Sequence, residues 1–420
     1  MRRRLPKGRL TFGLLLLLAM VLLFVVASPR LVPPASASTP VSGKTITPAL
    51  ADDEPRPPTI TATAAIVIDM DSGRVLYSRN ANARVPMAST TKIMTAVVAL
   101  ESLALQTKVT ISANAAATIG SKLWLETGQV LTVEQLMYGL LVSSANDAAV
   151  ALAEATAGST RAFVEKMNEK AKALGLSNTH FANVNGLNAE KHFSSAKDLA
   201  ILAQHAMQDP AFRSIVRTRE YSLPDPANPG MSLEHKNHNL LLNWRAWVTG
   251  VKTGSTPYAK YCLVASATRD GVSLISVLLG AEEDAVRWKE SKALLKYGFS
   301  LYARTVLADR GEMVTELAVP DGLDRRVRLV ADRPLVASLF KTDVVTSSVR
   351  ADRAVVLPVQ AGDVFGTMEF TLDGTSLGSV NLIAAQPVEN VTIRMILDHW
   401  RDRWLPNLAL RDLLRETSSP

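Results

Sequence analysis

The strongest constraint on the fold is a set of three short motifs that lie far apart along the chain. Residues 89–92 are Ser-Thr-Thr-Lys, residues 144–146 are Ser-Ala-Asn, and residues 252–254 are Lys-Thr-Gly. If a helix begins at Ser89, the hydroxyl lies at the positive end of that helix and Lys92 lies one turn on, on the same side. This geometry suits a serine nucleophile with a lysine as its proton acceptor. If the motifs form one site, the fold must bring three distant segments together.

None of the three motifs is specific by itself. The pattern S-x-x-K recurs at Ser194–Lys197 and Ser338–Lys341, and S-x-N recurs at Ser112–Asn114 and Ser379–Asn381. A capped helix, a turn or an ordinary strand start would explain any single match. Lys-Thr-Gly occurs once and opens an apolar strand, where its glycine would let a substrate backbone approach closely. Only the set that begins at Ser89 gives all three motifs in order, at a helix start, a loop and a strand edge.

The charge and the cysteine content exclude several classes of function. The net charge is +7, but six cations and no acidic residue lie in residues 1–37, so the rest of the chain is nearly neutral and no nucleic-acid partner is expected. The single cysteine, Cys262, excludes an intrachain disulfide and a cysteine-cage zinc or iron–sulfur site. The six histidines form no H-E-x-x-H pair, so no zinc protease of that type is indicated.

The N-terminus carries an export signal. Residues 1–9 are basic, and Leu10–Ala27 is an apolar run of 18 residues, just long enough to span a bilayer. Residues 1–37 are therefore a signal peptide, with a candidate cleavage site at Ala35-Ser36-Ala37, or an uncleaved anchor. In both cases the body of the protein is exported, because basic residues stay in the cytoplasm. Residues 38–59 are rich in proline and predict an extended linker.

Residues 60–308 predict an α+β domain with strands near both of its ends and helices between them. Apolar runs predict a hairpin at Ala62–Asp69 and Arg74–Arg79, and two further strands at Gly250–Ala267 and Val272–Leu279. The segments with helical patterns are Thr90–Leu103, several pieces of Val133–Leu176, Ser195–Gln208 and Arg287–Tyr302.

The C-terminal part of the chain has a different composition. Residues 309–388 contain short Val- and Leu-rich segments broken by turn signals, which predicts a small all-β domain. Within residues 389–420, Val391–Trp404 predicts an amphipathic helix with Trp400 and Trp404 on its apolar face. Such a helix suits a membrane interface, where Trp is favoured, or packing on the β domain. The pattern alone leaves both interpretations open.

The three motifs together are the constellation of the penicillin-binding proteins and serine β-lactamases. In detail the sequence resembles the low-molecular-mass penicillin-binding proteins of the peptidase S11 family, which are serine-type D-Ala-D-Ala carboxypeptidases. The segments that carry this resemblance are Ile66–Tyr77, Met87–Thr95, Ser144–Ala148, Leu174–Phe181 with Asn185-Gly186-Leu187, Gly250–Thr256 and Tyr261–Ala267. The resemblance implies a catalytic domain with an antiparallel sheet, helices on both of its faces and an α-helical cluster. It also implies that the β domain and the C-terminal helix serve as a stalk and a membrane anchor.

The resemblance further implies an acyl-enzyme mechanism on peptidoglycan stem peptides that end in D-Ala-D-Ala. The Ser89 hydroxyl would attack the penultimate D-Ala carbonyl, and neutral Lys92 would take the proton. Lys252 nearby would help to lower the pKa of Lys92. Ser144 would relay a proton to the leaving D-Ala amine. The backbone N–H groups of Ser89 and Ser255 would form the oxyanion hole.

Substrate binding is implied for a second group of residues. They are Asn146, Lys252, Thr253, Gly254, Ser255 and Arg287. Asn146 would hold the Lys92 amine or the substrate amide, and Lys252 with Thr253 would bind the region of the terminal carboxylate. Arg287 lies where the family places an arginine that aids carboxylate recognition. The best-studied relatives often carry a bulkier residue where this chain has Ser255, which leaves the substrate preference open.

The implied reaction needs no metal and no organic cofactor, and β-lactam antibiotics are the implied covalent inhibitors. The expected location is the outer face of the bacterial cytoplasmic membrane or the cell-wall space, with a role in cell-wall synthesis and remodelling. Three alternatives remain open at this point. They are a serine β-lactamase, a D,D-endopeptidase that acts on cross-links, and a non-catalytic wall-binding protein that keeps the fold. Glu190 lies where a β-lactamase might keep a glutamate for deacylation, but its segment matches the carboxypeptidases better.

Overall fold

The computed structural model describes residues 43–48, 55–224 and 232–404, which divide into two compact units. The larger unit spans residues 47–305 with 336–343, and the smaller unit takes residues 43–46, 306–335 and 344–404. The apolar run that we expect to be a signal or anchor lies outside the described residues. Among the residues that are described, no helix is both long and apolar enough to cross a membrane.

The larger unit is built on a five-stranded antiparallel sheet with the order β3-β2-β10-β9-β8. Its strands are β2 (Ala64–Asp69), β3 (Val75–Arg79), β8 (Val248–Thr256), β9 (Lys260–Arg269) and β10 (Val272–Ala281). The expectation of a single strand over Gly250–Ala267 is wrong. Pro257 has no N–H to donate to a ladder, and the chain reverses there so that Thr256 pairs with Lys260. β8 therefore becomes an edge strand of the sheet.

Both faces of this sheet are buried, which explains the nearly continuous apolar runs of its central strands. In β2, Ile66 and Ile68 face one core, while Ala65 and Val67 face the other. Successive side chains of a strand point to opposite faces, so each strand contributes to both cores. The first core lies against the helical cluster and the second lies under a single long helix.

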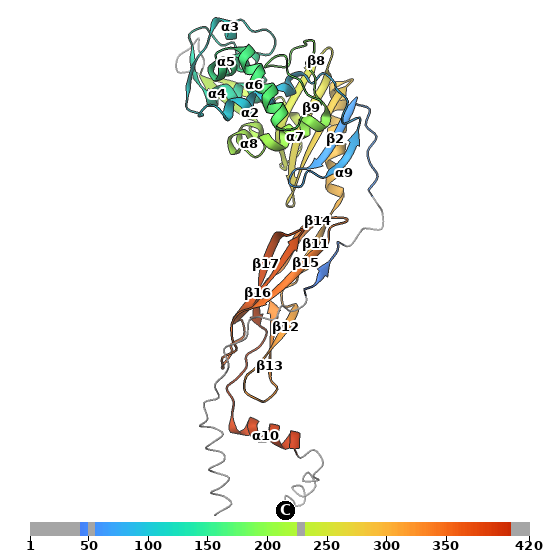
Figure 1. Cartoon of the computed structure of the whole chain (residues 1–420), viewed down its shortest axis with the longest axis vertical. Coiled ribbons are helices and arrows are strands. Elements are labelled where there is room, and N and C mark those ends of the chain that lie inside the picture. Colours follow the sequence, from blue (N-terminus) through green and yellow to red (C-terminus); the bar gives the residue numbers. More distant parts are fainter. Residues whose placement is uncertain (1–42, 49–54, 225–231, 405–420) are drawn as a thin grey trace, which may run out of the picture. The chain divides into compact units, whose positions relative to one another are not determined.

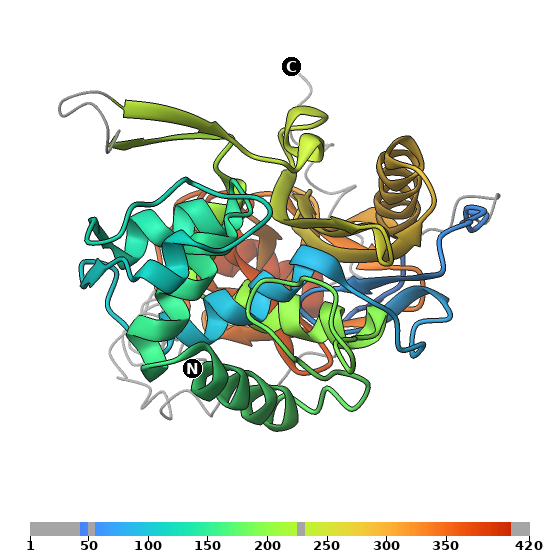
Figure 2. The same cartoon turned by 90° about the horizontal axis from the view of Figure 1, so that it is seen from above.

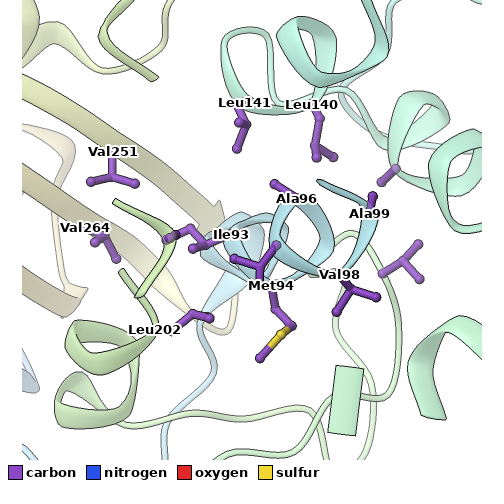
Figure 3. Close-up of a cluster of buried hydrophobic side chains, with 14 of the residues drawn as sticks. Ile93, Met94, Ala96, Val98, Ala99, Leu140, Leu141, Leu202, Val251 and Val264 are labelled. Atoms are coloured by element: carbon purple, nitrogen blue, oxygen red, sulfur yellow. The ribbon is translucent and has the colours of Figure 1, made fainter. Parts of the chain in front are cut away.

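Helices cover the two faces unequally, as Figure 2 shows, with one gold helix, α9 (Asp284–Ser300), on one side of the sheet. The helices of the opposite side are α2 (Lys92–Leu100), α4 (Val133–Leu141), α5 (Asn146–Ala157), α6 (Thr160–Ala173), α7 (Ala196–Ala206) and α8 (Pro210–Arg217). Ile93, Met94 and Ala96 of α2 lie in the middle of this core (Figure 3). The expected antiparallel sheet with helices on both faces is confirmed.

Short elements complete the larger unit around this framework. They are η1 (Ala88–Thr91), β4 (Lys108–Thr110), α3 (Ala113–Ala116), β5 (Val130–Thr132), η2 (Leu240–Asn243) and the hairpin of β6 (Glu220–Pro224) with β7 (Ser232–Lys236). In Figure 2 this hairpin projects away from the helical cluster.

The smaller unit is all-β, as expected, and ends in one helix. Its six-stranded sheet has the order β1-β15-β16-β17-β13-β12, labelled in part in Figure 1. The strands are β1 (Thr45–Ile46), β12 (Met313–Ala318), β13 (Arg326–Ala331), β15 (Val345–Ala351), β16 (Val364–Leu372) and β17 (Thr375–Ala384). Two other strands, β11 (Tyr302–Ala308) and β14 (Leu335–Phe340), form a separate two-stranded sheet, and both contain a point at which the chain passes from one unit to the other.

The domain limits differ from the expected ones in two places. Residues 38–59 are not wholly a linker, because Thr45 and Ile46 form an edge strand on β15 and Lys44 forms an ion pair with Glu312. The division between the units lies at 305/306 rather than 308/309, and residues 336–343 belong to the larger unit. The sequence pattern cannot reveal such a long-range pairing of a two-residue strand.

The C-terminal helix α10 (Ile393–Trp404) has an exposed apolar side. Ile393 is 69% exposed and Leu397 is 59% exposed, so these side chains are not packed on the sheet of the smaller unit. On the polar side Asp398 forms ion pairs with Arg394 and Arg401. Of the two interpretations of this helix, packing on the β domain therefore has no support from these side chains.

Candidate active site

Ser89 lies in η1, a tight turn that leads directly into α2. We expected a helix to begin at Ser89, but α2 begins at Lys92 and the serine belongs to the preceding 3-10 turn. Ala88 has a φ of +48°, which tightens the turn in front of the serine. The hydroxyls of the next two threonines donate to the carbonyls of Met87 and Ala88, so this turn is held from within.

The Lys92 amine has three polar neighbours that together define its chemistry. Its Nζ lies 3.0 Å from Ser89 Oγ, 2.7 Å from Asn146 Oδ1 and 2.7 Å from the carbonyl oxygen of Asn185. The last two oxygens can only accept, and a neutral amine has two N–H donors and one lone pair. With both N–H groups engaged, the lone pair is left to accept the proton of the Ser89 hydroxyl.

Burial favours this neutral amine. Lys92 is fully buried, and desolvation together with the charge of Lys252 lowers its pKa well below the ordinary value, against an opposing effect of Asp147. A lysine whose pKa is lowered in this way can serve as a general base.

The second motif supplies Asn146 at the start of α5. Its side-chain Nδ2 donates to the carbonyl of Ile119 at 2.7 Å, which orients Oδ1 toward Lys92. Gly120 permits this approach, since a Cβ there would lie 2.7 Å from Asn146 Nδ2. Ser144 precedes the helix with a φ of +60° and is 4% exposed.

The third motif lies on the edge strand β8, directly against the serine turn. A Cβ on Gly254 would lie 2.9 Å from Ser89 N and 3.0 Å from the carbonyl oxygen of Met87. The expectation that this glycine lets a substrate backbone approach therefore needs correction. The close neighbour is the protein's own η1 backbone, which could not pack there against any larger residue.

Lys252 is almost fully buried beside this contact and donates to the carbonyl of Thr253 at 3.0 Å. Burial, and then the charge of Arg287, lowers the pKa of Lys252 to about 7. The site thus contains a second amine that loses its proton easily.

Arg287 reaches the same strand from α9. Its Nη1 donates to the carbonyl of Gly254 at 3.3 Å, its Nη2 pairs with Asp284, and its guanidinium lies 4.3 Å from the Trp288 ring centre. Burial lowers the pKa of Arg287, opposed by Asp284. Ser255 is exposed at the end of the motif.

A cavity of about 750 Å³ opens onto these groups. The expected site residues that line it are Ser89, Ser144, Thr253, Gly254, Ser255 and Arg287. The other three, Lys92, Asn146 and Lys252, are almost fully buried. The structure thus brings all nine together in one region of the larger unit. In the described part of the chain, no three His, Cys, Asp or Glu side chains converge as a metal site.

Sequence reasoning missed two groups that complete the Lys92 environment. The carbonyl of Asn185 has no side-chain signature, although Asn185-Gly186 belongs to a segment that carries the family resemblance. Asp147, fully buried, accepts from the N–H groups of Leu123 and Leu125 at 3.0 and 3.2 Å. A charged residue at the start of an apolar helix was the available signal for Asp147.

His238 is a third missed residue and lines the cavity. Desolvation, followed by the charges of Lys252, Lys92 and Arg287, lowers the pKa of His238 to about 4. The imidazole is therefore neutral in the unliganded site at physiological pH. No sequence pattern marks this histidine.

A serine hydroxyl beside a buried amine of lowered pKa is the arrangement of an active-site-serine hydrolase. The chain belongs to the D-alanyl-D-alanine carboxypeptidase family, whose model matches residues 51–283. The model of the C-terminal domain of penicillin-binding protein 5 matches residues 302–390. The expected family, the serine peptidase class and the all-β C-terminal domain are confirmed.

Individual relatives agree with this assignment. The D-alanyl-D-alanine carboxypeptidase DacF of Bacillus subtilis is 34% identical over 351 residues, 82% of this chain and 90% of the relative. The enzyme of the same description from Escherichia coli, DacA, is 34% identical over 370 residues, again 82% and 90%. The solved DD-transpeptidase of Streptomyces K15 is 38% identical with a TM-score of 0.56, over 59% of this chain and 100% of that one. DacD from Francisella tularensis is 28% identical with a TM-score of 0.58, over 82% and 98%.

The contact between Gly254 and the serine turn gives a first prediction. Gly254→Ala will lower the acylation rate constant for labelled penicillin by about tenfold to a hundredfold, because the displaced backbone carries the nucleophile. Gly158→Ala is the matched control, since Gly158 ends α5 with a φ of +75° and has nothing within 4 Å of its Cβ direction. It will cost about 1 kcal/mol of stability without slowing acylation. Equal acylation rates in both variants would contradict the contact.

Lys252 gives a second prediction, on stability. Its folded pKa of about 7 lies below the ordinary 10.5, so the unfolded chain binds the proton more tightly between these values. Its contribution to stability therefore improves as the pH rises from 7 toward 10.5. Lys252→Met will be the more stable protein at pH 7, and this advantage will shrink by about 3 kcal/mol at pH 10. Denaturant titrations at both pH values measure it, and a constant difference would refute the buried-amine account.

Proposed function

We propose that this chain removes the terminal D-Ala from peptidoglycan stem peptides through an acyl-enzyme on Ser89. The single observation that supports this most is the arrangement around Lys92. Two oxygens that can only accept surround its amine and leave the lone pair to the Ser89 hydroxyl. We propose no catalytic role for the other two S-x-x-K matches, Ser194–Lys197 and Ser338–Lys341.

Acylation begins when Ser89 Oγ attacks the penultimate D-Ala carbonyl while its proton passes to Lys92 Nζ. The oxyanion that forms is held by the backbone N–H groups of Ser89 and Ser255. The location of Ser255 on an edge strand supports this role, since edge strands carry N–H groups without a sheet partner. Ser144 then relays this proton from Lys92 to the leaving D-Ala amine, the peptide bond breaks, and Lys92 is neutral again.

Deacylation uses the same groups in reverse. Water attacks the ester carbonyl and its proton passes to the amine of Lys92. Lys92 then returns this proton to Ser89 Oγ as the ester bond breaks. The product is a stem peptide shortened by one D-Ala.

The terminal carboxylate of the substrate is proposed to bind at Lys252, Thr253 and Arg287. Thr253 and Arg287 line the cavity, Lys252 is buried beside them, and the charge of Arg287 lowers the pKa of Lys252 in the empty site. A carboxylate between them would relieve this repulsion and form charge-assisted hydrogen bonds. Asn146 is proposed to orient Lys92 and to form a hydrogen bond with the substrate amide.

The third prediction tests the nucleophile. Ser89→Ala will release no D-Ala from a D-Ala-D-Ala peptide and will carry no covalent label after exposure to labelled penicillin. Ser338→Ala is the matched control, because Ser338 begins another S-x-x-K match in β14 and donates to the carbonyl of Asp270. The control will be labelled at the wild-type rate. Label on the Ser89 variant, located by peptide mass mapping, would disprove the assignment.

The same reagents separate the alternatives. A persistent penicillin adduct on Ser89 supports the carboxypeptidase, whereas rapid turnover of penicillin indicates a β-lactamase. Release of monomers from cross-linked stem-peptide dimers indicates endopeptidase activity. A Ser89→Ala protein that matches the wild type in every assay would indicate a non-catalytic protein.

Export and membrane association form a second part of the proposal. We place residues 60–308 as the reacting domain on the outer face of the cytoplasmic membrane, with α10 lying in the membrane interface. The exposed Ile393 and Leu397 of α10 support this, since an amphipathic helix binds a bilayer through such side chains. Residues 1–37 support export through their basic and apolar pattern.

The fourth prediction tests the anchors. Deleting residues 391–420 together with the N-terminal apolar run will move the protein to the soluble fraction after cell fractionation. In a protein that keeps residues 391–420 but lacks the N-terminal run, the Ile393→Asp/Leu397→Asp variant will also weaken vesicle binding, because charges oppose insertion. Exchanging Arg394 for Lys is the control and will leave binding unchanged. Membrane association of the double truncation would reveal another anchor.

A further inference from the structure

The turn that carries Ser89 is largely buried but borders open space on one side. A second cavity of about 350 Å³ adjoins it, with Met87, Ala88, Gly186 and His192 in its lining. Ala88 has a φ of +48°, a backbone conformation that is strained for a residue with a side chain. Strained backbone persists only where its surroundings hold it. The backbone of Gly186 packs closely on the Ala88 carbonyl, and a hydrogen bond to the same carbonyl adds a second restraint.

A chain of hydrogen bonds from His192 reaches this residue. The N–H of Ala182 donates to His192 Nδ1 at 2.9 Å, so this nitrogen carries no proton. The proton is therefore on Nε2, which donates to Thr91 Oγ1 at 2.8 Å. Thr91 Oγ1 in turn donates to the carbonyl of Ala88 at 2.8 Å. Every donor and acceptor in the chain has a fixed direction.

The environment of His192 keeps this direction. His192 is 7% exposed and Thr91 is fully buried, so water does not compete for the bond between them. Burial, followed by the charge of His180, lowers the pKa of His192 to about 4. The imidazole is therefore neutral at physiological pH and remains a single tautomer.

We propose that His192 is a positioning residue for acylation, which acts through Thr91 to fix the Ala88–Ser89 peptide. It touches neither the substrate nor the reacting atoms. The peptide that it fixes includes Ser89 N–H, one proposed donor to the oxyanion, and precedes the nucleophilic Oγ. Small displacements of such groups slow a reaction strongly. This inference rests on the proposed role of Ser89 as the nucleophile.

The backbone around His192 does not depend on its side chain. Val85 and Ser194 exchange two backbone hydrogen bonds at 2.9 and 3.0 Å, and His180 and Phe193 exchange two more at 2.9 and 3.1 Å. A substitution at His192 therefore leaves its segment in place. The side chain can be tested without removing the surrounding fold.

The side-chain amides of Gln and Asn differ in length, so each can replace one of the two imidazole nitrogens and its hydrogen bond. In His192→Gln, the amide nitrogen replaces Nε2 and still donates to Thr91, while the acceptor for Ala182 N–H is lost. In His192→Asn, the amide oxygen replaces Nδ1 and still accepts from Ala182, but the side chain is too short to reach Thr91. Both variants lose one hydrogen bond, so a purely structural role predicts similar behaviour.

The fifth prediction concerns the rate constant with which labelled penicillin acylates these variants. The thermal unfolding temperature of each variant is measured in parallel. His192→Asn will acylate about tenfold to a hundredfold more slowly than the wild type, and His192→Gln will stay within about threefold of it. Thr91→Val will match His192→Asn, and the double variant will lose little more, because both changes break one chain. Thr91→Ser is the control that keeps the bridging hydroxyl.

The outcomes distinguish the two proposals. Wild-type acylation in His192→Asn, or an equal loss in both His192 variants, would overturn the positioning role. Additive losses in the double variant would do the same. Penicillin label on Ser89→Ala, in contrast, would overturn the nucleophile itself, whatever the His192 variants do.

Discussion

The removal of the Lys92 amine from water is the physical constraint on which the site depends. A buried ammonium is costly, so burial favours loss of the proton, and a buried neutral amine still needs partners for its two N–H bonds. Asn146 Oδ1 and the carbonyl of Asn185 provide them from two separate segments. Hydrogen bonds to the Lys92 nitrogen thus fix the positions of the start of α5 and of the loop near residue 185. The same two bonds leave the lone pair aimed at Ser89.

Convergence of these segments requires glycine at each close approach. A Cβ on Gly186 would lie 2.1 Å from the carbonyl oxygen of Ala88, and one on Gly254 would lie 2.9 Å from Ser89 N. Gly120 makes the equivalent space for Asn146. In all three places the neighbour is protein rather than substrate. The glycines therefore set the distance between segments, and through it the position of the serine hydroxyl relative to its base.

A functional group could be predicted from the sequence where it belongs to a side chain of a particular residue type, and not where it belongs to the backbone. Side chains in ordered motifs, such as Ser89 and Lys252, were recognisable because their residue type carries their chemistry. The carbonyl of Asn185 was not, since every residue has one and only the fold decides where it points. The separation of β8 from β9 was missed because a turn of three residues interrupts a continuous apolar pattern. The pairing of Thr45 with Thr346 escaped for a different reason, because so short a strand has no periodicity and its partner is distant in the chain.

The charges at the site suit the anionic substrate group that we propose to bind there. Lys252 and Arg287 lie close enough for Arg287 to lower the pKa of Lys252, and Asp284 is already paired with the guanidinium. An arriving carboxylate would favour the charged form of Lys252 and so raise its pKa. The additional charge on Lys252 would in turn oppose protonation of Lys92, whose pKa Lys252 already lowers. The negative charge of the carboxylate would act on Lys92 in the opposite direction, so the substrate and the newly protonated Lys252 together would add no net charge beside the base, and a C-terminal amide would bring neither charge.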